Sequence, residues 1–237
     1  MSKKVVVFSG AGMSEESGIN TFRDVDGLWE GEDLLTIASL DGWHKDPQLV
    51  LDFYNERRKH LLKVFPNEGH KALADLQAHA EVSIITQNVD NLHERAGSEN
   101  VIHLHGELLK SQSSIDPELT FDCVKDISLK DKCPKGSQIR PNIVWFGEAV
   151  ERLDDAISEV IEADIFIIIG TSLQVYPAAG LVSFLRPETP VYYIDSNPAT
   201  NPELELVTEL NVIKNTAAIA IPELIMQLKK TVLTFNK

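Results

Sequence analysis

One histidine in this sequence stands where it could do acid–base chemistry. His105 follows the apolar run 101–104 and precedes Gly106. An imidazole titrates near neutral pH, so at the end of a strand His105 could take a hydroxyl proton as a general base. His103 lies two residues earlier, on the other side of the strand's pleat, and we expect it and His93 to be structural.

A glycine-rich turn, Gly10, Ala11 and Gly12, follows the first apolar run. A turn between a strand and a helix start presents free N–H groups to an anion such as a phosphate. A dehydrogenase fingerprint would need a third glycine where Glu15 stands, and an acidic residue at the end of a second strand about 20 residues further on. Residues 24–33 do not look like a strand, so a hydride-transfer domain is disfavoured. The alternative is a plain tight turn.

Polar residues also follow two later apolar runs. Gln87, Asn88 and Asp90 follow residues 81–86, and residues 170–172 end the most apolar run. Open α/β sheets bind ligands at the carboxyl ends of their strands. Amides and a carboxylate suit a carboxamide and ribose hydroxyls, while small hydroxyl residues suit ribose and phosphates. The alternative for the first group is a polar turn that caps a helix starting at Asn91.

Apolar runs and helical patterns alternate along the chain and would position these residues. Continuous Val/Ile-rich runs predict strands covered on both faces, at 4–9, 81–86, 101–104, 164–170, 191–195 and 211–214. Apolar residues at three- and four-residue spacing predict helices at 47–65, 67–80, 149–162, 177–186 and 216–230. This alternation predicts an α/β fold with a Rossmann-like, doubly wound parallel sheet.

The spacing of the strands is uneven. Residues 10–80 and 106–141 are longer gaps than a single crossover helix needs, so we interpret them as insertions that build a smaller module beside the sheet. The sequence therefore predicts two domains. The Rossmann-like domain comprises residues 1–25, 76–106 and 142–237, and the small domain comprises residues 26–75 and 107–141.

The composition excludes several classes of protein. The chain has 237 residues and a formal net charge of −14, which would be repelled by nucleic acid and acidic lipid, so we expect neither as a partner. Two cysteines are too few for a disulfide scaffold, and no apolar run approaches the roughly 20 residues of a membrane span. The sequence passes from MSKK into a strand without a signal peptide pattern, and we expect a cytoplasmic monomer.

Five motifs occur in a fixed order along the chain. They are GAGMSEESGINTFRDVDGLWEG at 10–31, TQNVDNLH at 86–93, HLHGE at 103–107, WFGE at 145–148 and GTS at 170–172. In this order they resemble the sirtuin family of NAD-dependent protein-lysine deacylases, of a bacterial type, and the resemblance runs from residue 4 to about residue 228. It implies an NAD-binding Rossmann-like domain and a small domain built from two insertions, with NAD consumed as a co-substrate.

The resemblance also implies roles for residues in the NAD site. His105 and Asn88 are the expected catalytic residues, and Phe22 would shield the reacting carbon from water, although Phe22 could instead be a core aromatic and Arg23 a surface charge. The family usually has asparagine where Asp195 stands. The expected cofactor-binding residues are Gly10, Ala11, Gly12, Ser14, Glu16, Thr21, Phe22, Arg23, Trp29, Gln87, Asn88, Asp90, Gly170, Thr171, Ser172, Asp195, Ser196, Asn197 and Ala217.

An acylated lysine peptide would lie as an added strand between the segments 144–148 and 172–175, which look extended. Tyr54 and Arg57 share a helix face, and a phenol and a guanidinium together suit a terminal carboxylate. Among the sirtuins, this pair resembles the subclass that removes succinyl and malonyl groups; the alternative is a solvated run of charges. The expected substrate-binding residues are Ala38, whose small side chain would widen the pocket, Tyr54, Arg57, Val144, whose carbonyl would accept the lysine N–H, Phe146, Gly147, Glu148 and Val175.

The metal site usual in sirtuins is incomplete here. Structural zinc needs four nitrogen or sulfur ligands, and the second insertion holds only Cys123 and Cys133, with Ser113 and Lys135 at places expected for partners. We therefore expect no zinc and a degenerate zinc-ribbon-like module. The alternative is a site completed by carboxylates, of which the candidates are Asp122, Asp126 and Asp131.

The sequence thus predicts an NAD-dependent deacylase with desuccinylase, demalonylase and deacetylase activity, which produces nicotinamide, O-acyl-ADP-ribose and free lysine. The acyl oxygen would attack the ribose carbon as nicotinamide leaves, and His105 would then activate a ribose hydroxyl. Two rivals remain. An NAD hydrolase or ADP-ribosyltransferase would not need Tyr54 and Arg57, and a non-catalytic NAD-binding sensor would not need His105.

Overall fold

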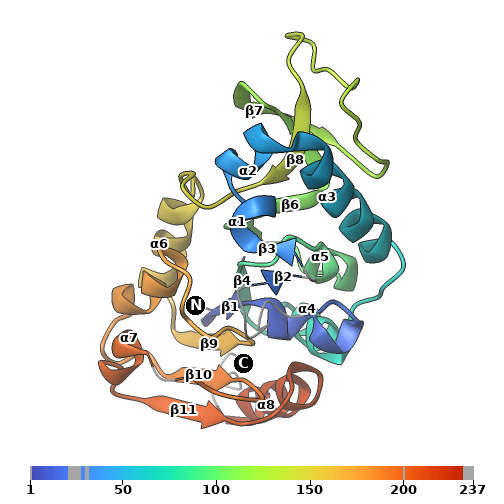
Figure 1. Ribbon diagram of the computed structural model, residues 1–237. Helices are drawn as coiled ribbons and strands as arrows, with labels where there is room; N and C mark the ends of the chain where they lie inside the picture. Colours follow the sequence, from blue (N-terminus) through green and yellow to red (C-terminus); the bar gives the residue numbers. More distant parts are fainter. Residues whose placement is uncertain (1, 21–27, 30–31, 200, 232–237) are drawn as a thin grey trace.

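The central feature of the fold is a sheet of six parallel strands (Figure 1). The computed structural model describes residues 2–20, 28–29, 32–199 and 201–231. The strands follow the order β11-β10-β9-β1-β4-β5 across the sheet. They are β1 (Lys4–Ser9), β4 (Glu81–Thr86), β5 (Val101–His103), β9 (Ile165–Ile169), β10 (Val191–Ile194) and β11 (Leu210–Ile213). All six predicted strands and the doubly wound α/β fold are confirmed.

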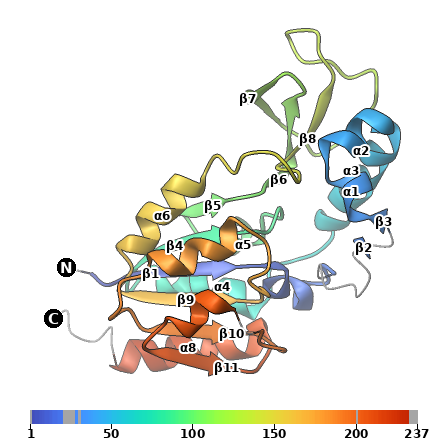
Figure 2. The same cartoon turned by 60° about the vertical axis from the view of Figure 1, so that its left-hand side comes forward.

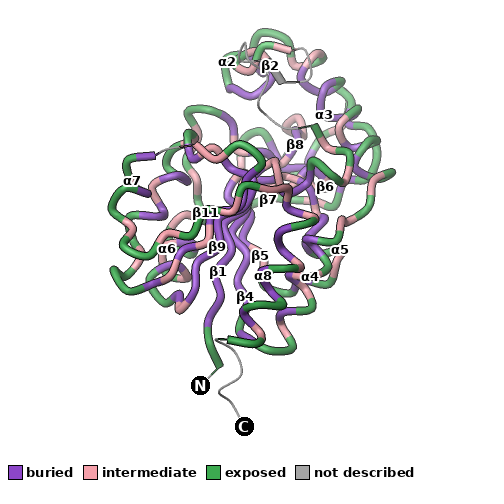
Figure 3. Tube along the Cα trace, turned by 90° about the horizontal axis from the view of Figure 1, so that it is seen from below, coloured by how far each residue is buried: buried purple, intermediate pink, exposed green. Residues whose placement is uncertain are grey.

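Helices cover both faces of this sheet, which explains the unbroken apolar runs (Figure 3). In β1, Val5 and Val7 pack toward α4 (Glu68–Leu76) and α8 (Ala217–Thr231). Val6 and Phe8 point the other way, into a cluster with α6 (Leu153–Ile161) and η3 (Ala178–Phe184). Because successive side chains of a strand alternate between faces, a strand buried on both sides must be apolar throughout.

One of the predicted helices has a different geometry. Residues 178–184 form the 3-10 helix η3 and not an α-helix. Gly180 lies near its middle, where glycine disfavours the α-helix, and its N–H donates to the Pro177 carbonyl at 3.0 Å in the three-residue spacing of a 3-10 turn. Short helices α5 (Leu92–Ala96) and α7 (Pro202–Glu205) complete this part of the chain.

A smaller antiparallel sheet lies apart from the main one (Figure 2). Its order is β7-β6-β8, formed by β6 (Gly106–Ser113), β7 (Asp116–Asp122) and β8 (Ile139–Ile143). The first insertion contributes β2 (Leu28–Trp29), β3 (Glu32–Asp33), α1 (Leu34–Ile37), α2 (Leu40–Lys45) and α3 (Pro47–Leu61). The short paired strands β2 and β3 contradict the expectation that residues 24–33 hold no strand. Residues of both insertions, among them Trp43, Val50, Leu108 and Ile143, share one apolar cluster, so the insertions pack as one module.

Hydrogen bonds to α3 hold the long loop of the second insertion. The Asn55 amide donates to the Ile127 carbonyl and accepts from the Ile127 N–H, both at 2.9 Å. Both cysteines are free thiols, and Cys133 Sγ lies 3.1 Å from Ser137 Oγ. Hydrogen bonds with Ser113 and Ser137 lower the pKa of Cys133 to about 7. Hydroxyl groups are therefore the hydrogen-bonding partners of this thiol.

Two features of the described ranges bear on metals and membranes. The one group of three potential metal ligands whose ligand atoms lie within 4.8 Å of one another is Glu94, His103 and Glu107, which contains none of the cysteines. No helix in those ranges has the length and apolar character of a membrane span.

Candidate active site

The loops that follow β1, β4, β5 and β9 meet at the carboxyl end of the main sheet. There β1 lies between β4 and β9, so the chain turns to opposite sides of the sheet and leaves a crevice. The crevice holds a cavity of about 290 Å³. Nineteen of the predicted site residues line it: Gly10, Ala11, Gly12, Ser14, Ala38, Tyr54, Arg57, Gln87, Asn88, Asp90, His105, Val144, Phe146, Gly147, Glu148, Gly170, Thr171, Ser172 and Val175.

A smaller cavity adjoins the first, because Gly12 and Gly170 line both. Of the residues predicted for the adenosine end of NAD, this cavity is lined by Asp195, Ser196 and Ala217. Asn197 lines neither cavity, and its N–H donates to Asp195 Oδ1 at 2.7 Å. The predictions for Thr21, Phe22, Arg23 and the side chain of Trp29 fall outside the described residues.

Glu16 also lines neither cavity. Its carboxylate accepts from Thr216 Oγ1 at 2.9 Å and from the Ala218 N–H at 2.7 Å. A carboxylate at this place satisfies a backbone N–H of the first turn of α8 and interacts favourably with the helix dipole. In this structure Glu16 therefore caps α8. Its side chain does not line the cavities, where we expected it to contact the cofactor.

The glycine turn is built differently from the expected anion site. The Gly10 N–H donates to the Ile169 carbonyl and the Gly12 N–H to the Gly170 carbonyl, both at 2.9 Å, so the expectation of free N–H groups at these two residues is wrong. The glycines are needed for close approach: a Cβ on Gly12 would lie 2.7 Å from the Gly170 Cα. Their effect is to let the loops after β1 and β9 touch and leave the crevice open above them.

His105 lies in the cavity with its ring orientation fixed. Its Nδ1 is 3.1 Å from the Gln87 backbone oxygen, which can only accept, so Nδ1 carries the proton and Nε2 keeps its lone pair. Burial lowers the pKa of His105, and the hydrogen bond to Gln87 only partly opposes this shift. Gly106, with φ of +84°, turns the chain immediately afterwards, where a Cβ would meet the Asn142 carbonyl at 2.2 Å. His105 is thus a neutral imidazole at neutral pH, and its Nε2 can accept a proton.

Asn88 and Asp90 form a chain of hydrogen bonds with Ser14 beside this base. The Asn88 amide donates to Ser14 Oγ at 3.2 Å, and Ser14 Oγ donates to Asp90 Oδ2 at 2.9 Å. Asp90 Oδ1 accepts from the Leu92 N–H at 3.0 Å, so Asp90 also caps α5, as the alternative interpretation proposed. Burial raises the pKa of Asp90. Gln87 Nε2 donates to Thr171 Oγ1 at 2.9 Å and thereby links the loops after β4 and β9.

The far wall of the cavity is formed by α3. Tyr54 is fully buried, and its hydroxyl accepts from Trp145 Nε1 at 3.1 Å. Burial raises the pKa of Tyr54, so the phenol stays protonated and able to donate. The Arg57 guanidinium lies 4.7 Å from the centre of the Phe53 ring, and its buried Nε has no hydrogen-bond partner among the described residues. An unsatisfied buried donor on a cavity wall favours an acceptor from a ligand.

The segments expected to be extended are only partly so. The Phe146 N–H donates to the Ala38 carbonyl at 2.9 Å, which ties the WFGE motif to the first insertion. The motif then turns at Gly147, whose φ is +91°, and Leu173 in the second segment has φ of +55°. Neither segment is therefore a continuous strand, and each presents only a short backbone edge to a peptide.

The sequence interpretation missed several residues around this site. Trp145 is buried and stacks beneath the Arg140 guanidinium at 4.1 Å, while Arg140 Nη2 lies 2.5 Å from Glu148 Oε1. Glu148 Oε2 also accepts from the Trp145 N–H at 2.9 Å, so Glu148 braces the motif. A lone arginine inside the apolar run 139–146 was the signal for this contact. The other unpredicted lining residues include Asn20, His60, Leu108, Val150 and Tyr176.

Comparisons with known proteins agree with the fold and the motif order. The sequence profile described as Sir2 family matches residues 10–177. The "NAD-dependent protein deacylase" of Helicobacter pylori (strain ATCC 700392 / 26695) is 59% identical over 193 residues, which cover 81% of this chain and 84% of that protein. The protein of the same name from Bacteroides thetaiotaomicron is 48% identical over 229 residues, covering 94% of this chain and 96% of that protein.

A solved structure gives the same result. The structure titled "Crystal structure of a Sir2 homolog-NAD complex" superposes with a TM-score of 0.86 at 37% sequence identity, covering 97% of this chain and 90% of that one. The expected family and α/β fold are confirmed, and NAD is confirmed as the co-substrate. The chain belongs to the Sir2 family.

Proposed function

We propose that this NAD-dependent protein deacylase removes succinyl and malonyl groups, as well as acetyl groups, from protein lysines. The deacylase activity agrees with its relatives, which carry that name at up to 59% identity. The observation that carries the acyl preference is that Arg57 lines the cavity while its buried Nε has no hydrogen-bond partner among the described residues. The products would be free lysine, nicotinamide and O-acyl-ADP-ribose.

The residues present fit NAD. Gly12 and Gly170 line both cavities. Because glycine has no side chain to block the passage between them, an elongated ligand can extend from one cavity into the other. Hydroxyl, amide and carboxylate groups line both, as ribose and carboxamide groups require. When bound, NAD supplies a ribose carbon for attack by the acyl oxygen as nicotinamide leaves, and a ribose hydroxyl that receives the acyl group.

His105 would take the proton from that hydroxyl. Its Nε2 has a lone pair, its pKa is lowered by burial, and its Nδ1–H is held by the Gln87 carbonyl, so no proton must first be lost at neutral pH. The Val144 N–H donates to the His105 carbonyl at 3.0 Å, which keeps Val144 beside the base. We propose that the Val144 carbonyl accepts the lysine N–H, and that Asn88, held through Ser14, faces the carboxamide.

Arg57 would bind the distal carboxylate of a succinyl or malonyl group. A guanidinium binds a carboxylate by two parallel hydrogen bonds, and Arg57 still has its Nε donor to offer. We propose that Tyr54, which lines the same cavity and stays protonated, also contacts this carboxylate. An acetyl group makes no use of either and needs only the apolar wall, which includes Ala38.

The test compares acyl groups on one peptide sequence. In Arg57→Met we expect kcat/KM to fall about tenfold to a hundredfold for succinyl- and malonyl-lysine, because a hydrogen bond to a charged group is lost, and to change less than about threefold for acetyl-lysine. Lys59→Met is the matched control, since Lys59 lies on the exposed side of α3 and pairs with Glu56 and Asp126. Equal losses on all three peptides would overturn the assignment. Nicotinamide release without any peptide would favour an NAD hydrolase.

The remaining parts of this proposal concern organisation and setting. We propose that residues 1–25, 76–106 and 142–237 form the NAD-binding domain and residues 26–75 and 107–141 the small domain, supported by the separate apolar cluster of the two insertions. We also propose that the protein is a monomer. Two free thiols are typical of a reducing compartment such as the cytoplasm. The net charge of −14 argues against nucleic acid as a partner.

A further inference from the structure

His103, two residues before the proposed base, stands between two hydrogen-bond acceptors. Its Nδ1 lies 3.0 Å from the Asn88 backbone oxygen, and its Nε2 lies 2.7 Å from Glu94 Oε1. Neither a carbonyl nor a carboxylate can donate, so each contact needs a proton on the ring. A neutral imidazole has only one N–H, and therefore only the imidazolium makes both bonds.

The groups around His103 favour this charged form. Helix α5 contributes Glu94, β6 contributes Glu107, and Asp90 lies in the preceding loop. Against these stand the Lys110 ammonium, which is 2.7 Å from Glu107 Oε1, and the neighbouring ring of His93 on α5. Burial alone would lower the pKa of His103, but the hydrogen bond and charge of Glu94, together with Glu107, raise it above its ordinary value of 6.5.

The loop 87–89 is held through three consecutive carbonyls. His105 Nδ1 donates to the Gln87 oxygen, His103 Nδ1 donates to the Asn88 oxygen, and the Leu108 N–H donates to the Val89 oxygen at 2.8 Å. The first bond survives in neutral His105, and the third is between backbone groups. Only the bond to Asn88 depends on an ionised side chain.

We propose that His103 is a positioning residue: as an imidazolium it holds the Asn88 carbonyl and with it the wall of the cavity, and loss of its Nδ1 proton to solvent releases that wall. The remaining proton stays on Nε2, where the carboxylate of Glu94 is the stronger acceptor. The Nδ1 lone pair then faces the lone pairs of the Asn88 oxygen at 3.0 Å, so the contact turns from attractive to repulsive. Deacylation accordingly falls on the alkaline side as His103 loses its proton. The proposal rests on the proposed role of Asn88.

The first experiment measures His103 itself in the full-length protein. With 13C-labelled histidine, the Cε1 resonance that disappears in His103→Gln is followed against pH in the wild type and in Glu94→Gln. We expect its midpoint above 6.5 in the wild type, and lower by about one unit or more without the carboxylate. A midpoint at or below 6.5 in the wild type would overturn the proposal.

The second experiment is the pH profile of kcat and KM with an acetyl-lysine peptide. The alkaline limb of kcat should coincide with the His103 titration in the wild type and move down with it in Glu94→Gln. His103→Gln, whose amide donates at every pH, should rescue turnover and lose that limb, whereas His103→Leu should lower kcat about tenfold at pH 7.

If His103 were merely structural, its substitution would change thermal stability and leave the alkaline limb of kcat in place. This result would overturn the proposal. If a variant fails to fold, the wild type still tests the proposal, because the midpoint of the His103 titration must coincide with the midpoint of the alkaline limb of kcat. Failure of the underlying site assignment has a different signature. Asn88→Ala would then keep full activity, while the resonance of His103 would still titrate as described.

Discussion

The Nδ1 atom of His105 lies 3.1 Å from the backbone oxygen of Gln87, and this contact fixes which nitrogen of the proposed base is free. The next carbonyl along the loop, that of Asn88, is held in the same way by His103. Burial lowers the pKa of His105, while the carboxylate of Glu94 overcomes burial and raises the pKa of His103. The pKa values of two histidines at one strand end are thereby shifted in opposite directions, which would let a single site provide a base and a fixed donor.

The first prediction concerns the acid limb of activity. A base works only while it is unprotonated, so activity is lost as the pH falls through the pKa of His105. Because that pKa lies below 6.5, the acid limb of kcat/KM should be centred below pH 6.5. The measurement is kcat/KM against pH with an acetyl-lysine peptide at saturating NAD.

His105→Ala provides the control for this limb. We expect kcat to fall by about a hundredfold or more, the usual contribution of a general base, while the affinity for ADP-ribose measured by calorimetry stays within about threefold, because His105 acts on a proton. An acid limb centred above pH 6.5 would contradict the assignment of His105.

The second prediction concerns Gly170, where the loops after β1 and β9 meet. Its φ is +58°, and a Cβ there would lie 2.4 Å from the Gly12 carbonyl carbon and the Met13 nitrogen. Gly170→Ala therefore adds a clash with backbone to an unfavourable conformation, and should lower the free energy of unfolding by about 2 kcal/mol or more. Urea denaturation measures this loss, and calorimetry should show weaker binding of ADP-ribose.

Gly136→Ala separates the cost of the backbone conformation from the cost of a steric clash. Gly136 has φ of +81°, but a Cβ on it would meet no atom of the described residues within 4 Å, so only the backbone contribution remains, about 1 kcal/mol. Similar losses at the two glycines would show that the close approach at Gly170 has no energetic weight.

The sequence predicts best what burial on both sides dictates. Every residue of β1 is buried, so the middle of the strand had to be apolar, and the run KVVVFS marks the strand to the residue. The same holds for β9, with the pattern IFIII. The site follows from these strands, because the residues after them must come together at one edge of a parallel sheet.

What the sequence did not predict depends on partners distant along the chain. Glu16 lies in the motif for which we expected cofactor binding, but its bonds are to Thr216 and Ala218, 200 and 202 residues away. The N–H groups of Gly10 and Gly12 bond to carbonyls of the β9 strand and its following loop. A local pattern specifies the turn but not which groups remain free, because that is decided by tertiary contact.

The third prediction distinguishes these two interpretations of Glu16. If Glu16 caps α8, Glu16→Ala should lower the free energy of unfolding by about 0.5–2 kcal/mol, the usual range for a lost helix cap, and leave the affinity for ADP-ribose unchanged. Thr216→Val in the same background tests the pairing, since two residues that bond to each other give non-additive losses. Additive losses, or a weaker affinity for ADP-ribose with unchanged stability, would restore the cofactor interpretation.

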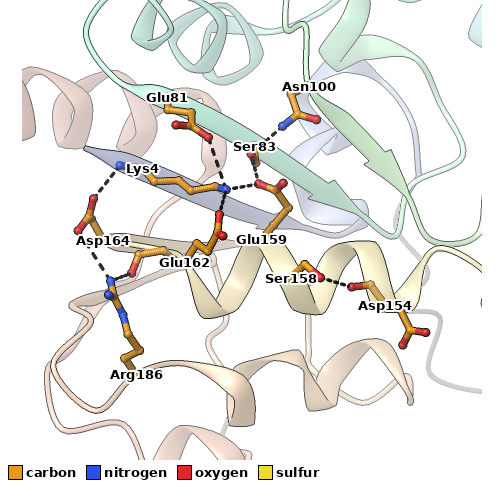
Figure 4. Close-up of polar contacts among 11 residues, drawn as sticks. Lys4, Glu81, Ser83, Asn100, Asp154, Ser158, Glu159, Glu162, Asp164 and Arg186 are labelled. Atoms are coloured by element: carbon orange, nitrogen blue, oxygen red, sulfur yellow. Dashed lines mark hydrogen bonds and ion pairs between the residues drawn. The ribbon is translucent and has the colours of Figure 1, made fainter. Parts of the chain in front are cut away.

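The fourth prediction concerns Lys4, which begins β1 and so lies at the opposite end of the sheet from the cavity. Figure 4 shows its side chain among the carboxylates of Glu81, Glu159 and Glu162. Its Nζ lies 2.7 Å from Glu162, 3.0 Å from Glu159 and 3.4 Å from Glu81. Burial alone would lower the pKa of Lys4, but the hydrogen bonds to Glu162 and Glu159 outweigh it and raise that pKa. Lys4→Met leaves three carboxylates without their cation, so the free energy of unfolding should fall by about 1–3 kcal/mol at pH 7.

This loss should depend on pH in a defined direction. The hydrogen bond from Lys4 lowers the pKa of Glu162, so the contribution of that pair is present above the ordinary pKa of a glutamate and disappears as the pH falls through the lowered value. The difference in stability between wild type and Lys4→Met should therefore shrink between pH 6 and pH 3. Lys71→Met is the control, because the Lys71–Glu68 pair is equally short, at 2.7 Å, but is exposed on α4 and should contribute less than about 0.5 kcal/mol. Equal losses for the two lysines, or a difference that grows in acid, would mean that burial gives the Lys4 cluster no advantage over an ordinary surface pair.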